Sequence, residues 1–269
     1  MTGWDGTGIV FAGHGTREDA GVAEFHAFVS QVADQVVRRL RTGADEADWV
    51  PPRFVSGFLE LAEPGILDAI AEVYRRGARR VLLVPLFLFA AGHLKHDLPA
   101  LVQDARARWP DLAVATLDAV GWDEAFAAVA AERLQAAGFQ GGDGECVLFI
   151  GRGNRDAKAQ AEFVKVACGI AARAGARTWV HCFLAGTGPT LEEGLAACAA
   201  LAPKAVYALP YLWFQGYLTR RLPGQLRAWE ALRPGVPIYL AGHLGVHPRL
   251  VARLAERVAA ALREIAAGS

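Results

Sequence analysis

The feature that most constrains the fold of this chain is an internal duplication. Short apolar runs rich in β-formers alternate with amphipathic stretches, giving four strand–helix units in residues 1–140 and four more in residues 141–269. Strands that alternate with helices form parallel sheets covered by helices on both faces, joined by right-handed crossovers. The sequence therefore predicts an α/β fold of two tandem doubly wound parallel-sheet repeats.

Three motifs align between the two halves, and each of them follows a predicted strand. Residues 13–17 (GHGTR) align with 151–155 (GRGNR), residues 58–64 with 183–189, and residues 85–99 with 210–223. The glycine-rich stretch 138–144 is the expected seam. Because ligands of open α/β sheets bind beyond the carboxyl ends of the strands, all three motifs lie where a site is expected. We expect a cleft between the two repeats to hold a large planar ligand.

Two histidines of the first half are the candidate metal ligands. His14 lies between two glycines that allow a tight turn, and His93 follows the third strand run in Gly92-His93-Leu94. If the first and third strands are neighbours, the two imidazoles can converge on one ion, and neutral imidazole suits Co, Ni and Fe(II). The alternatives are a phosphate-binding glycine turn with an incidental histidine, or solvated loop histidines.

Two carboxylates and a further histidine accompany this pair. Glu60 and Glu63 follow the second strand run and are candidates for a third metal ligand or a proton acceptor, the alternative being a solvated turn. His96 lies three residues beyond His93, where a helical turn brings both to one face. We expect His93 to be the ligand and His96 to bind a substrate carboxylate or to be exposed.

The second half replaces these groups at every aligned position. His14 becomes Arg152, His93 becomes Tyr217, His96 becomes Arg220 and Glu60 becomes Ala185. The metal chemistry is therefore predicted for residues 1–140, and carboxylate binding by arginines for residues 141–269. Arg221 is a further arginine of the second half, and it is the one that the alternative of an ordinary charge on a helix surface fits best. The complete predicted set of substrate-binding residues is Arg17, Lys95, His96, Arg152, Arg155, Tyr217 and Arg220.

The amino-acid composition excludes few classes of function, but together with the sequence it indicates the cellular compartment. Twenty-eight Lys and Arg balance twenty-eight Asp and Glu, so no global field indicates nucleic acid or an anionic membrane as a partner. The chain shows neither a basic leader nor a long apolar run, which favours a cytoplasmic protein. The four cysteines form no CxxC pair, so neither a thiolate zinc site nor an iron–sulfur cluster is expected.

These motifs resemble the class II chelatases of the sirohydrochlorin cobaltochelatase and ferrochelatase family, in the long form with two tandem repeats. The resemblance covers nearly the whole chain and rests on Gly-His-Gly-Thr at 13–16, Phe-Leu-Glu-x-x-Glu-Pro at 58–64, and Val-Pro-Leu-Phe-Leu-x-x-x-Gly-His at 84–93 followed by Asp-x-Pro. It implies an ATP-independent lyase that inserts a divalent metal into sirohydrochlorin, a tetrapyrrole with eight carboxylates. His14 and His93 would bind the metal and assist proton removal, with Glu60 matching the family's glutamate.

Several choices stay open at this point. Co²⁺, for cobalamin, is slightly favoured over Fe²⁺, for siroheme, and Ni²⁺ is not excluded. This sequence lacks the histidine-rich tail and the iron–sulfur cysteine motif of some long-form relatives, which leaves the metal open. Glu63 is the carboxylate assigned to the metal and Glu60 the one assigned to catalysis. A non-catalytic tetrapyrrole or metal carrier, and a phosphate- or nucleotide-handling α/β enzyme, are the alternative functions. We expect a monomer.

Overall fold

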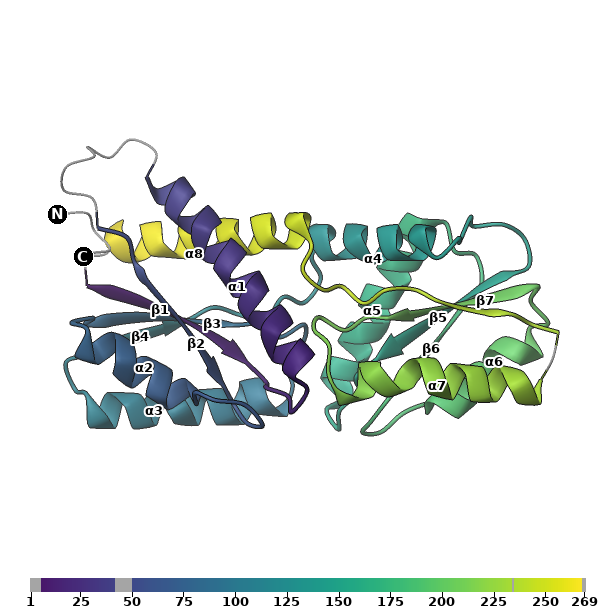
Figure 1. The fold of residues 1–269 in the computed structure, drawn as a ribbon, viewed down its shortest axis with the longest axis horizontal. Helices are drawn as coiled ribbons and strands as arrows, with labels where there is room; N and C mark the ends of the chain where they lie inside the picture. The colour runs from purple at the N-terminus through teal and green to yellow at the C-terminus, as the bar shows by residue number, and fades with distance from the viewer. Residues whose placement is uncertain (1–5, 42–49, 234, 268–269) are drawn as a thin grey trace. The chain divides into compact units, whose positions relative to one another are not determined.

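The computed structural model describes residues 6–41, 50–233 and 235–267, with the side chain of His93 left out. By its contacts the chain divides into two compact units, one of residues 1–120 and 248–269 and the other of residues 121–247. Each unit holds one four-stranded parallel sheet with helices on both faces (Figure 1). The predicted fold class is confirmed.

The sheet of the first unit has the strand order β2-β1-β3-β4, and every neighbouring pair is parallel. Its strands are β1 (Thr7–Gly13), β2 (Arg53–Phe58), β3 (Arg80–Pro85) and β4 (Ala113–Thr116). Its helices are α1 (Asp19–Leu40), α2 (Ile66–Arg75), the short π-helix η1 (His93–Asp97), α3 (Leu98–Arg108) and α8 (Pro248–Ala267). The chain runs from β1 to one side and then to β3 on the other, so the edge beyond β1 and β3 is a topological switch point.

The sheet of the second unit repeats this arrangement with the order β6-β5-β7-β8. Its strands are β5 (Glu145–Gly151), β6 (Trp179–Phe183), β7 (Ala205–Pro210) and β8 (Ile238–Leu240). Its helices are α4 (Glu124–Ala136), α5 (Ala157–Ala174), α6 (Leu191–Ala200) and α7 (Tyr217–Leu232). The central strands β1 and β5 are buried and apolar except at their first residues, Thr7 and the partly exposed Glu145, as expected for parallel sheets covered on both faces.

Each compact unit contains the last helix of the other sequence repeat in place of its own. Helix α8, the last element of the second repeat, packs with α1 in the first unit, where Arg39 donates to the carbonyl of Ala252 at 3.4 Å and Arg257 to that of Asp118 at 2.9 Å. Helix α4, the last element of the first repeat, belongs to the second unit, where Arg133 donates to the carbonyl of Leu244 at 2.9 Å. The boundary between residues 140 and 141 therefore describes the repeats, whereas the units divide after Val120 and after His247.

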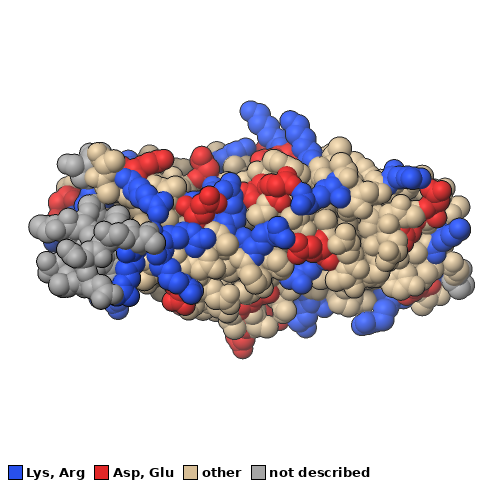
Figure 2. All heavy atoms as spheres, turned by 90° about the horizontal axis from the view of Figure 1, so that it is seen from above, with Lys and Arg blue, Asp and Glu red and all other residues tan. Residues whose placement is uncertain are grey.

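The surface charge, the helices and the cysteines of the structure can be compared with the amino-acid composition. On the face shown in Figure 2, Lys and Arg side chains are interspersed with Asp and Glu. Within the described part of the chain, no helix has both the length and the apolar character needed to cross a membrane. Three of the four cysteines are buried, whereas Cys168 is exposed.

Candidate functional site

The backbone beyond β1 and β2 places residues 14 and 60 side by side. The pairing of the two strands, which ends at Gly13 and Phe58, is continued by two loop hydrogen bonds. The amide of Leu59 donates to the carbonyl of Gly13 at 2.9 Å, and the amide of Glu60 donates to the carbonyl of His14 at 3.1 Å. The side chains of His14 and Glu60 therefore start from adjacent positions at the edge of the sheet.

Gly15 allows this close approach. Its φ is +91°, and a Cβ built on it would lie 1.8 Å from the carbonyl oxygen of Glu60. No side chain fits in that space, and a positive φ is unfavourable for residues that carry one. The glycine that follows His14 thus fixes the distance between the His14 turn and the Glu60 loop.

The two side chains contact each other. His14 Nε2 lies 3.4 Å from Glu60 Oε1, with the imidazole 23% exposed and the carboxylate 50% exposed. The other ring nitrogen, Nδ1, lies 3.3 Å from the carbonyl oxygen of Gly15. A partly buried imidazole beside an accessible carboxylate can bind a divalent cation through few ligands, and it can also accept and pass on a proton.

The strand adjacency that the two-histidine prediction required is present. Strand β3 pairs with β1, with Pro85 opposite Ala12, and η1 begins at His93 beyond this end of β3. The side chain of His93 lies outside the described part of the structure, so its convergence with His14 stays a prediction. Lys95 and His96 lie on η1 and are exposed. Among the described side chains, no three His, Cys, Asp or Glu are grouped so as to hold a metal.

The other predicted residues of the first repeat lie on the same edge. Glu63 is exposed in the loop that carries Glu60, and Arg17 is exposed in the turn between β1 and α1. Glu60 is the carboxylate recorded in contact with His14. The assignments of Glu63 to the metal and of Arg17 to the substrate stay predictions.

The second unit has the same backbone frame with other side chains on it. The amide of Leu184 donates to the carbonyl of Gly151 at 3.0 Å, matching the bond between Leu59 and Gly13. Gly153 has a φ of +81°, and a Cβ on it would lie 1.8 Å from the carbonyl oxygen of Ala185. Arg152 is exposed in the position of His14. The second unit therefore keeps the geometry and lacks the imidazole–carboxylate pair.

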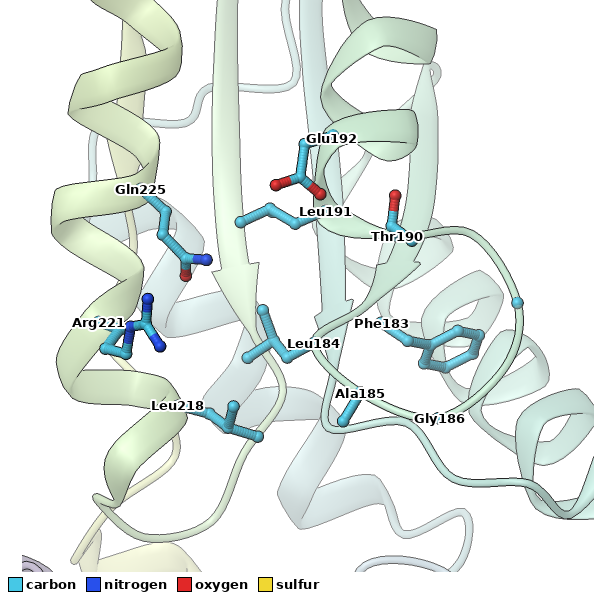
Figure 3. A pocket seen from close by; sticks show the side chains of 11 residues that line it. Phe183, Leu184, Ala185, Gly186, Thr190, Leu191, Glu192, Leu218, Arg221 and Gln225 are labelled. Atoms are coloured by element: carbon cyan, nitrogen blue, oxygen red, sulfur yellow. The ribbon is translucent and has the colours of Figure 1, made fainter.

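A cavity of about 230 Å³ opens beside this second frame (Figure 3). Arg221 and Gln225 reach it from α7, and Glu192 faces them from the start of α6, above Leu184 and Leu218. In the first unit the positions of Glu192 and Gln225 are held by leucines that pack on the core, Leu67 and Leu101. Polar groups thus line a hollow here where the first unit has apolar packing.

Arg221 is the functional candidate that sequence reasoning assigned to the helix surface. Its Nη1 donates to the hydroxyl of Tyr217 at 2.5 Å, and its guanidinium carbon lies 5.2 Å from the centre of that ring. Arg220 lies 6.0 Å from the same ring and is not among the residues that line the cavity. The available signal was a change of charge between copies, because Arg221 stands where the first repeat has Asp97.

The buried cysteine of β6 is not suited to bind metal. Burial, together with the nearby negative charge of Glu192, raises the pKa of Cys182 to about 12. Its thiol therefore stays protonated near neutral pH, and metals bind the thiolate.

Comparisons with known proteins agree on one family. The sequence model of the CbiX family matches residues 8–137 and 146–261. A sirohydrochlorin ferrochelatase of Priestia megaterium is 30% identical over 250 residues, covering 93% of this chain and 88% of the relative. A sirohydrochlorin cobaltochelatase of the same organism is 27% identical, covering 93% and 78%. The structure of SirB from Bacillus subtilis with Fe³⁺ superposes with a TM-score of 0.76 at 26% identity, covering 97% of this chain and 96% of SirB.

Proposed function

The chain belongs to the CbiX family, and we propose that it is a sirohydrochlorin chelatase, a lyase that inserts a divalent metal ion into sirohydrochlorin. The observation that carries the proposal is the contact between His14 Nε2 and Glu60 Oε1, 3.4 Å apart on a backbone frame that Gly15 fixes. Relatives at 30% and 27% identity bear the names of iron and cobalt enzymes that act on this substrate.

The pair supplies the two operations that metal insertion needs. The incoming ion must exchange its waters for pyrrole nitrogens, and two N–H protons must leave the macrocycle. His14 Nε2 holds the ion through one of few protein ligands, which leaves its other positions open to the macrocycle. Glu60, which is half exposed, accepts a proton and releases it to water. His93 is the proposed second metal ligand and Glu63 a further carboxylate for the ion.

The exposed cations are proposed to orient the substrate. Eight carboxylates require several donors, and the guanidinium group binds a carboxylate through two parallel hydrogen bonds. Exposed candidates in the first repeat are Arg17, Lys95 and His96. In the second repeat they are Arg152, Arg155, Arg220 and Tyr217, to which we add Arg221.

The finer assignments are part of the proposal. We propose that Co²⁺ and Fe²⁺ are the metal substrates, with Co²⁺ favoured and Ni²⁺ to be tested beside them, because one imidazole and one carboxylate suit all three ions. Insertion is proposed to proceed without ATP and without an iron–sulfur cluster, in a cytoplasmic monomer that binds neither nucleic acid nor membrane.

The test is an anaerobic absorbance assay of metal insertion into sirohydrochlorin without ATP. Purified protein is assayed with Co²⁺, Fe²⁺ and Ni²⁺ separately against protein-free controls. Acceleration by the wild type, with kcat about 100-fold lower in His14→Ala and in Glu60→Gln, is the expected result. Glu63→Gln is the matched control for Glu60→Gln and should raise the KM for the metal with a smaller effect on kcat.

Two outcomes would overturn the proposal. Tetrapyrrole binding by the wild type without accelerated insertion would identify a carrier. Unchanged kcat in both His14→Ala and Glu60→Gln would show that this pair is not the catalytic site.

A further inference from the structure

The loop that carries Glu60 contains a residue in a strained backbone conformation. Leu61 has a φ of +63°, and the amide of Ala62 donates to the carbonyl of Glu60 at 2.8 Å. Leu61 is thus the central residue of a γ-turn with positive φ, a rare and strained conformation for a residue with a side chain. Its neighbour in sequence is the carboxylate in contact with His14.

Packing offsets this strain only in part. Leu61 is 47% exposed, one of eight exposed large apolar residues in the described part of the chain. A leucine that is half in water gains only about half of the burial free energy that a core leucine gains. The exposed part of its side chain contributes no burial to the fold.

The second copy of the fold holds glycine in the corresponding place. Gly186 has a φ of +82°, and the two loops share one closing hydrogen bond: Phe183 N donates to Pro189 O at 2.8 Å, as Phe58 N donates to Pro64 O at 2.9 Å. A Cβ on Gly186 would lie 2.3 Å from the carbonyl oxygen of Asn154, so close packing requires glycine there. The loop of the first unit instead leaves room for a side chain at Leu61 and holds that residue about half in water.

We propose that Leu61 is a substrate-contacting residue, whose exposed side chain packs against the apolar face of the tetrapyrrole beside His14 and Glu60. This inference rests on the proposed function. The γ-turn holds the leucine on the loop of the catalytic carboxylate, so the macrocycle contacts Leu61 when its nitrogens reach the metal. Binding the substrate covers the part of the side chain that water contacts in the free protein.

Two substitutions separate the side chain from the backbone turn. Glycine and asparagine both tolerate positive φ, so Leu61→Gly and Leu61→Asn keep the turn and the position of Glu60 while removing the apolar contact. Burying about half of a leucine side chain corresponds to about a fivefold change in affinity. We expect the Kd for metal-free sirohydrochlorin, measured by fluorescence titration, and its KM to rise about fivefold in both variants. The kcat should stay within about twofold of wild type, and the thermal unfolding midpoint should be unchanged or higher.

Ala202→Gly is the matched control, because Ala202 is the other described non-glycine residue with positive φ, at +49°, after the end of α6. Relief of strain there should leave Kd and KM unchanged. Wild-type affinity in both Leu61 variants would overturn the inference, even if the wild type is an active chelatase. Absence of metal insertion by the wild type would instead overturn the proposed function. The contact is tested separately, because wild-type affinity of the Leu61 variants for sirohydrochlorin would refute it whether or not the wild type inserts metal.

Discussion

Substituting Gly15 by alanine should disrupt the site more than any ordinary Gly→Ala change. The positive φ of +91° costs an alanine about 1 kcal/mol, and its Cβ would lie 1.8 Å from the carbonyl oxygen of Glu60. Relieving that overlap moves one backbone segment by about an ångström or more, since close-packed atoms cannot interpenetrate. Overpacking of this kind costs a further 1–3 kcal/mol or so. We expect Gly15→Ala to lower the free energy of unfolding by about 2–4 kcal/mol in total and to displace Glu60 from His14.

Two further glycines divide this effect into its parts. Gly77 has a φ of +94° with nothing within 4 Å of a built Cβ, so Gly77→Ala measures the dihedral cost alone. Gly153 has the same 1.8 Å overlap, with the carbonyl of Ala185, in the unit that lacks the catalytic pair. Gly153→Ala should therefore destabilise the protein about as much as Gly15→Ala, without a direct effect on the imidazole–carboxylate contact.

The assay pairs urea unfolding with kcat for metal insertion, measured where the variants are folded. Gly77→Ala should lower the free energy of unfolding by about 1 kcal/mol and leave kcat unchanged. Gly15→Ala should lose more stability and about 100-fold in kcat, the size of the expected loss in Glu60→Gln. The reasoning fails if Gly15→Ala is no less stable than Gly77→Ala, or if it keeps wild-type kcat.

Two other predictions follow from the packing. Leu254 of α8 is 2% exposed, so Leu254→Ala should lower the free energy of unfolding by about 2–5 kcal/mol. Although the residue belongs to the second sequence repeat, the variant should lose hydrogen-exchange protection in the first unit. Loss of protection in the second unit alone would contradict the assignment of α8 to the first unit. Burial lowers the pKa of His181 from its usual 6.5, so the folded state resists its protonation and stability is lost as the pH falls below about 6.5. His181→Phe, which keeps a ring facing Phe183, should reduce the loss of unfolding free energy between about pH 7.5 and 5.5, and an unchanged loss would refute this.

The sequence was sufficient for the fold because its patterns are local and repeated. Strand–helix alternation required parallel sheets, and residue-by-residue alignment of the motifs required two of them. The same patterns predicted that His14 and Glu60 would lie on one edge, since each follows a strand and parallel strands end together.

Three features could not be predicted, each for a physical reason. Helices α4 and α8 are amphipathic or apolar, but an apolar helix face does not indicate which sheet the helix covers. The sequence therefore could not predict that α4 packs in the second unit and α8 in the first. Arg221 has the same side chain as Arg220, and only the phase of α7 decides which of them lines the cavity. The γ-turn at Leu61 was invisible because leucine normally avoids positive φ.

The duplication also makes the proposed tests interpretable. The second copy builds the same loop frame with arginine in place of His14 and alanine in place of Glu60, so neither side chain is needed for the frame to form. Variants at these two positions should therefore fold, and a loss of metal insertion reports on chemistry. Gly15 has a glycine counterpart with the same steric requirement, which assigns it to the frame. Leu61 differs from all three, because its backbone conformation is costly for leucine while about half of the residue is in water, so the proposed contact with the macrocycle can be tested at its side chain alone.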